Sequence, residues 1–97
     1  MEETKEIQEQ RDLLNAKYRR DIPKAGELWR HFKGNAYKII ACPVMHTETR
    51  EFYCVYQALY GSYGIYCRPL DMFMSEVDHE KYPQVQQKYR FEKAQHT

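Results

Sequence analysis

The placement of glycine most constrains the fold of this chain. All four glycines fall in the middle of 97 residues, at positions 26, 34, 61 and 64. They separate short runs in which apolar and polar side chains alternate, a pattern typical of β-strands with one buried face. The predicted strands cover residues 28–32, 36–42, 51–59 and 64–68. The last strand ends at Pro69, because proline has no N–H to donate to a ladder.

The run over 51–59 is the strongest of these strands. One face carries Phe52, Cys54, Tyr56 and Ala58, and the opposite face is also largely apolar. We therefore predict that this strand is central and covered on both sides. Short strands joined by short turns favour an antiparallel meander that curls on itself. The predicted fold is mainly β, a small, partly open SH3-like barrel, followed by one helical turn at 70–74; with its helix the whole chain is α+β.

The two ends of the chain differ from this middle part. Residues 1–22 contain neither Gly nor Pro, and helical spacing places Ile7, Leu14 and Tyr18 on one face. The tail is polar and is compatible with a helix starting at Tyr82-Pro83 or with a short edge strand at 90–92. The predicted organisation is an N-terminal amphipathic helix, a barrel domain and a C-terminal extension, over 1–23, 24–77 and 78–97.

Composition excludes several classes of protein. Fifteen Lys and Arg against fourteen Asp and Glu leave a net charge of +1, so no whole-chain field attracts nucleic acid or membrane. No apolar run approaches the roughly 18 residues that span a bilayer. The first residues are acidic and polar, unlike a signal peptide. With three cysteines and no secretion signal, we expect a cytoplasmic protein with reduced thiols.

Four runs carry a resemblance to a known family. They are GELWRHFKG at 26–34, HTET at 46–49, VYQALYG at 55–61 and RPLDMF at 68–73. In this order and spacing the chain resembles a family of small bacterial proteins known as domain of unknown function 1653, over about residues 25–77. The resemblance implies a compact, mostly β domain and assigns no catalytic roles.

The cysteines offer little support for a metal site. Cys42 and His46 have loosely suitable spacing, but the paired knuckles of structural zinc sites do not occur. Cys54 and Cys67 lie inside predicted strands, where free cysteine behaves as a small hydrophobic residue. We predict that the cysteines belong to the core, and we expect no metal and no other cofactor.

A polar and aromatic set forms the candidate binding surface. We predict that the loop after the second strand and the end of the fourth meet on one rim of the sheet. Arg68 can then form an ion pair with Glu48 that ties the loop down, or it can select an anionic or planar ligand. The candidate binding residues are Trp29, His46, Thr47, Glu48, Tyr56, Tyr60, Arg68 and Met72.

Three functions remain open from the sequence. The first is a non-catalytic module that binds nucleic acid, RNA before others, or a peptide, because tyrosine rings stack on bases and offer wide contact faces. The second is a small hydrolase or transferase that works through His46 and Glu48. The third is a structural protein that forms a homodimer through the N-terminal helix. The observation that best distinguishes these functions is whether His46, Glu48 and Arg68 lie together in one concave site.

Overall fold

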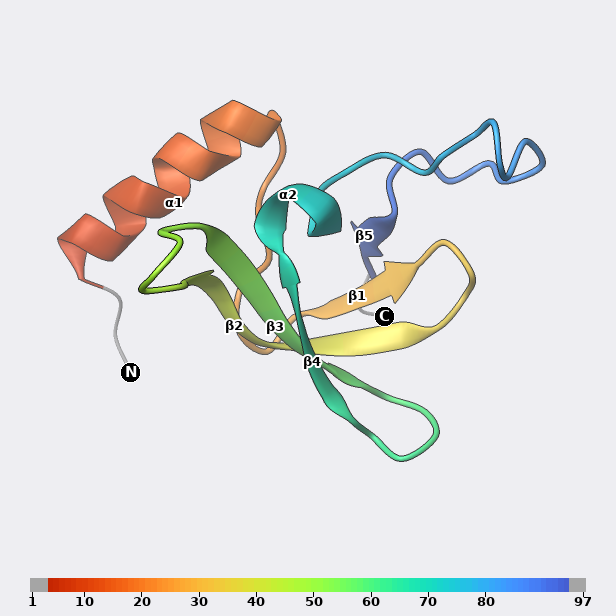
Figure 1. The fold of residues 1–97 in the computed structure, drawn as a ribbon, viewed down its shortest axis with the longest axis horizontal. Coiled ribbons are helices and arrows are strands. Elements are labelled where there is room, and N and C mark those ends of the chain that lie inside the picture. Colours follow the sequence, from red (N-terminus) through yellow and green to blue (C-terminus); the bar gives the residue numbers. More distant parts are fainter. Residues whose placement is uncertain (1–3, 95–97) are drawn as a thin grey trace.

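The computed structural model describes residues 4–94, and Figure 1 shows its fold. Its elements are α1 (Lys5–Tyr18), β1 (Leu28–His31), β2 (Ala36–Met45), β3 (Phe52–Ala58), β4 (Ile65–Pro69), α2 (Leu70–Phe73) and β5 (Phe91–Lys93). Residues 1–3 of the predicted helical segment and 95–97 of the predicted extension lie outside the described residues. The N-terminal helix, the four predicted strands and the helical turn are confirmed.

The five strands form one antiparallel sheet in the order β4-β3-β2-β1-β5. At its centre Ile39 of β2 lies opposite Tyr56 of β3, which in turn lies opposite Tyr66 of β4. The tail contributes β5, which pairs with β1 and places Lys93 opposite Trp29. The edge-strand alternative for the tail is therefore confirmed, and a helix beginning at Tyr82-Pro83 is wrong.

The sheet curls but does not close. The prediction of a partly open barrel is therefore corrected to an open antiparallel sheet. The edge strands β4 and β5 are joined by no ladder within residues 4–94. Side chains approach across the gap instead. Phe91 of β5 stacks on Phe73 of α2 with ring centroids 4.1 Å apart, and the Arg68 guanidinium of β4 lies 5.6 Å from the Phe91 ring. These side chains occupy the space that a closing ladder would need.

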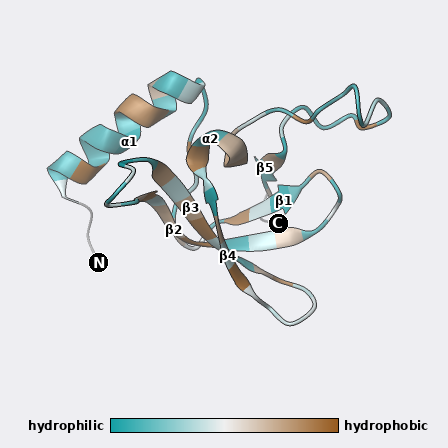
Figure 2. Cartoon of the chain, in the orientation of Figure 1, coloured by the Kyte–Doolittle hydropathy of each residue, from teal (hydrophilic) through white to brown (hydrophobic). Residues whose placement is uncertain are grey.

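The two faces of β3 differ in burial. Cys54, Tyr56 and Ala58 are buried on the inner face, as predicted. The outer-face residues Val55 and Gln57 are only partly buried, so the prediction of cover on both sides is wrong. Figure 2 shows β3 as mostly hydrophobic, whereas α1 is banded hydrophilic and hydrophobic. Both helices contribute to the core on the inner face, through Leu14 and Phe73.

Strand β2 changes face near its middle. Its pairing with β3 shifts register between Ile39 and Ala41 and again between Ala41 and Val44. Such bulges insert an unpaired residue and bend the strand. Cys42 is consequently buried, although simple alternation places Ala41 in the core.

Helix α1 docks on the sheet through a buried arginine. The Arg11 guanidinium donates to the carbonyl oxygens of Cys42 and Pro23, at 2.6 and 2.7 Å. Leu14, on the same face of the helix, is buried in the core. The helix begins at Thr4, whose hydroxyl accepts from the Ile7 N–H at 3.2 Å. Arg11 could not be assigned to the interior from the sequence, because a charged side chain is rarely fully buried.

The segment between α2 and β5 runs outward and returns, as Figure 1 shows. Its two arms are joined by a bridge between Glu76 and Tyr89. The returning arm then meets the turn after β1, where the Phe32 N–H donates to the Arg90 carbonyl at 3.0 Å. The tip contributes Tyr82, whose ring lies 5.0 Å from that of Phe32. This excursion therefore brings residues of the tail against the first strand.

Candidate functional site

The predicted loop residues lie in the turn between β2 and β3. His46, Thr47 and Glu48 are all exposed. The His46 Nδ1 accepts from the backbone N–H groups of Glu48 and Thr49, each at 3.3 Å. The His46 ring lies 5.9 Å from Tyr53, which belongs to the outer face of β3. His46 therefore orders its own turn on the outer side of the sheet.

Arg68 lies on the inner face, where it meets the predicted tyrosines. It is opposite Cys54 in the β3–β4 ladder, and its Nε donates to the Tyr56 hydroxyl at 3.1 Å. Tyr60 joins the same group through its hydroxyl, 2.8 Å from that of Tyr37. Together they form a cavity of about 290 Å³, here called the tyrosine pocket, lined by Tyr37, Tyr56, Tyr60, Tyr66, Cys67 and Arg68.

The turn and the tyrosine pocket do not converge. Residues on successive positions of a strand point to opposite faces, and Cys54, next to Tyr53, marks the inner face. His46 therefore lies on the other side of the sheet from Arg68. Within residues 4–94, no ion pair joins Glu48 to Arg68. The structure brings together Tyr56, Tyr60 and Arg68 and leaves the turn residues apart.

The two remaining predicted residues lie elsewhere. Trp29 is only 2% exposed; its Nε1 donates to Glu27 at 3.1 Å, and its ring lies 5.6 Å from Phe73. Its ring therefore belongs to the core and has no open stacking face. Met72, in α2, is 47% exposed. It does not line the tyrosine pocket.

Tyr37 is the tyrosine of the pocket whose pKa is shifted by its surroundings. Burial, followed by the hydrogen bond with Tyr60, raises the pKa of Tyr37. At neutral pH the Tyr37 phenol is thus uncharged, and the Arg68 guanidinium lines the same pocket. Tyr66 forms an exposed wall of the pocket, and its ring lies over Gly64, where a Cβ would meet the phenol oxygen at 2.6 Å. Gly64 is thus needed for this position of the Tyr66 ring.

A second cavity adjoins the first through Arg68. This basic pocket has a volume of about 300 Å³ and lies between the turn after β1, the end of β4 and the excursion of the tail. Its lining residues are His31, Phe32, Lys33, Arg68, Asp78, Lys81, Tyr82 and Arg90. This pocket could not be predicted from the sequence pattern, because half of its lining residues belong to the tail, which was predicted to be a separate extension.

His31 is neutral inside the basic pocket. Burial, followed by the nearby cations Arg68, Lys33 and Arg90, lowers the pKa of His31 from 6.5 to about 4. Its Nδ1 accepts from the Lys33 N–H at 3.1 Å, so the neutral ring carries its proton on Nε2. His31 therefore offers a hydrogen-bond donor without adding a charge.

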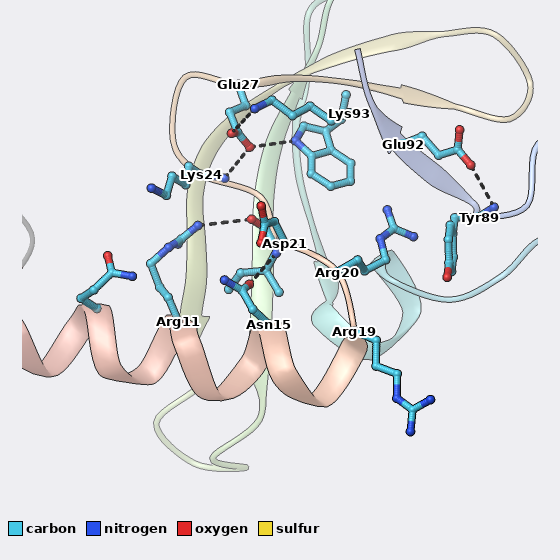
Figure 3. Close-up of a pocket in the computed structure, with 13 residues that line it drawn as sticks. Arg11, Asn15, Arg19, Arg20, Asp21, Lys24, Glu27, Tyr89, Glu92 and Lys93 are labelled. Carbon is cyan, nitrogen blue, oxygen red and sulfur yellow. Dashed lines mark hydrogen bonds and ion pairs between the residues drawn. The ribbon is translucent and has the colours of Figure 1, made fainter. Parts of the chain in front are cut away.

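A third cavity, with a volume of about 720 Å³, lies between α1 and the β1–β5 edge. Figure 3 shows side chains of both charge signs around it, with Arg20 beside the ring of Tyr89. The guanidinium lies 3.8 Å from that ring and donates to the Phe91 carbonyl at 2.7 Å. Glu27 is occupied as well, by Trp29 and by an ion pair with Lys93 at 2.9 Å. These contacts join the segment between α1 and β1 to β5 and to the chain that leads into it.

The cysteines divide into two kinds. Cys42 and Cys54 are buried, as predicted, and hydrogen bonding to Cys42, followed by burial, raises the pKa of Cys54. Cys67 is exposed, so the prediction that it packs in the core is wrong, because it lies opposite Val55 on the uncovered outer face. Among the described residues, no cluster of three or more His, Cys, Asp or Glu is placed to hold a metal ion.

These features define an α+β protein in which an N-terminal helix precedes an open five-stranded antiparallel sheet with adjoining aromatic and basic pockets. The chain belongs to the family described as Protein of unknown function (DUF1653), whose model matches residues 27–93. The resemblance seen in the sequence ended at about residue 77, whereas this match continues to residue 93 and includes β5. No curated protein and no solved structure matches the chain. Neither helix in residues 4–94 is long and apolar enough to cross a membrane.

Proposed function

We propose that this protein is a non-catalytic binding module that holds single-stranded RNA on the inner face of its sheet. The observation that carries the proposal is the position of Arg68, which lines both the tyrosine pocket and the basic pocket. A ligand that spans them needs a planar group for the rings and an anionic group for the cations. A nucleotide has both.

The tyrosine pocket suits bases without demanding one sequence. Tyr60 and Tyr66 are 44% and 51% exposed, so their rings are available at its rim. Stacking of a base on an aromatic ring contributes about 1–3 kcal/mol and tolerates every base. With a net charge of only +1, the chain depends on such stacking together with local charge.

Arg68 supplies the polar contact. Among the hydrogen bonds of residues 4–94, its side chain uses only Nε, toward Tyr56, which leaves its Nη donors for a ligand. A guanidinium both stacks on planar groups and donates to phosphate. By comparison, His46 and Glu48 are exposed in a turn on the outer side, and no contact there favours a hydrolase or transferase.

Fluorescence anisotropy with a labelled single-stranded RNA of mixed sequence tests the proposal, at two salt concentrations. We expect Tyr66→Ala and Arg68→Ala each to weaken binding by about fivefold or more, the value of one lost stacking or charged contact. Tyr63→Ala is the matched control, because Tyr63 is similarly exposed in the same hairpin but lies outside the pocket. Binding that ignores both substitutions, or a preference for peptides over RNA, contradicts the proposal.

A further inference from the structure

We propose that the basic pocket binds a terminal phosphate, a phosphate monoester, at one end of the RNA strand whose bases occupy the tyrosine pocket. This inference rests on the proposed function and adds a substrate feature to it. It gives the protein a preference for phosphorylated ends over continuous strands.

The charge of the pocket fits a doubly charged anion. Its cations are Lys33, Arg68, Lys81 and Arg90, and its one acid is Asp78. The Asp78 Oδ1 already accepts from the backbone N–H groups of Glu80 and Lys81, at 3.1 and 3.2 Å. The pocket thus keeps an excess of three positive charges. A phosphate monoester carries nearly two negative charges at pH 7, whereas each internal diester carries one.

The cations are held together without acidic partners. The ion pairs within residues 4–94 are Lys17–Asp71 and Lys93–Glu27, and neither includes a lining residue of the basic pocket. Lys33 and Lys81 come from distant parts of the chain, yet their Nζ atoms lie 5.5 and 5.4 Å from the same Tyr82 ring. Repulsion among such groups favours an anion between them.

Two uncharged or unused donors complete the pocket. The Arg90 Nε is buried without a hydrogen-bond partner in the described residues, which is costly for a charged group. The neutral His31 presents its Nε2 hydrogen, because Nδ1 is occupied by the Lys33 N–H. Its ring is held against Phe91 at 4.9 Å. A phosphate oxygen can accept from the His31 hydrogen, and Arg90 contributes its charge to the pocket.

The test compares RNAs of one sequence with a free 5′ hydroxyl, a 5′ phosphate or a 3′ phosphate. We expect one phosphorylated strand to bind about tenfold more tightly than the unphosphorylated strand, the value of a charge-assisted contact. Lys81→Gln is expected to abolish that difference. Lys38→Gln, an exposed lysine of β2 outside both pockets, is the matched control and keeps it.

A second measurement follows His31 by NMR during titration with inorganic phosphate and with a nucleoside monophosphate. We expect the His31 pKa to rise with either ligand, and not to rise in the Lys81→Gln variant. Equal affinity for all three RNAs overturns this inference alone, since the proposed function then survives. Failure of every RNA to bind overturns the proposed function together with the inference.

Discussion

His31 is the residue whose state reports most directly on the basic pocket. It faces the cations Lys33, Arg68 and Arg90 and shares the pocket with Lys81, Tyr82 and Asp78. Three cations next to a half-buried ring make a fourth charge unfavourable. The ring therefore stays neutral in the folded protein at a pH where an unfolded chain begins to protonate it.

This difference predicts how stability depends on pH. The folded pKa of His31 is about 4 and the ordinary value is 6.5, so the unfolded state binds more protons between them. We expect the contribution of His31 to the free energy of unfolding to fall as the pH drops from about 6.5 to 4. Urea unfolding across this range measures it, and His31→Gln is expected to flatten that part of the profile. An NMR midpoint near 6.5 in the folded protein contradicts the prediction.

At this scale the sequence identified the right side chains but not their partners. Arg68 could be assigned to a strand end from Pro69, and Tyr56 and Tyr60 to its neighbourhood. An ion pair between Arg68 and Glu48 requires the turn between β2 and β3 to lie on the same face of the sheet as Arg68. Faces follow from register, and the bulges of β2 alter register in a way that alternation alone does not reveal.

Helix α1 contacts the core of the sheet along one side. The predicted stripe of Ile7, Leu14 and Tyr18 correctly located one face, but only Leu14 is buried. Tyr18 is partly buried against the core and donates its hydroxyl to Asp71 of α2. Leu14 and Tyr18 contact the core of the same chain, whereas Ile7 is 39% exposed, and dimerisation through this stripe stays a prediction. Leu14 and the buried Arg11 are the residues through which the helix docks on its own sheet.

Two adjacent leucines of α1 test this arrangement. Leu14 is 7% exposed and Leu13 is 73% exposed. We expect Leu14→Ala to lower the free energy of unfolding by about 2–4 kcal/mol, because it leaves a cavity between helix and sheet. Leu13→Ala should change it by no more than about 0.5 kcal/mol. Thermal or urea unfolding compares them, and equal effects of the two substitutions would show that the helix is not docked.

Strand β5 was the least predictable element. It contains only three residues, too few for a periodic pattern, and the sequence left a helix open for the preceding segment. Its position is decided by Phe91, which is 1% exposed and meets Phe73, Tyr37 and Tyr56. Such long-range packing cannot be read from neighbouring residues.

Considered as a whole, the molecule is a sheet whose two edges meet through side chains. The sequence predicted the antiparallel order and the curvature, because strand patterns and turn residues are local. It also predicted a partly open barrel, whereas the observed sheet does not close into a barrel. A closed barrel requires the edge strands β4 and β5 to form a hydrogen-bonded ladder. Here the stacked rings of Phe73 and Phe91 lie between the two edges instead.

Removal of the tail tests whether the central part folds alone. A chain ending at residue 77, the predicted domain boundary, lacks β5 and Phe91. Loss of one buried phenylalanine costs about 3–5 kcal/mol, a large share of the 5–15 kcal/mol typical of a domain. We expect circular dichroism to show no cooperative unfolding for this chain, whereas a chain ending at Ala94 should unfold cooperatively. Matching transitions for the two chains would contradict this view.

The pairing of β1 with β5 sets the order of events when the chain folds. Local hairpins such as β3–β4 close short loops, but Trp29 and Lys93 must find each other across most of the chain. Closing the longest loop costs the most conformational entropy. This cost is offset only when the aromatic side chains of the core pack together. Chains that lack the β1–β5 pairing thus gain little stability, and we expect folding to be one cooperative step that the last strand completes.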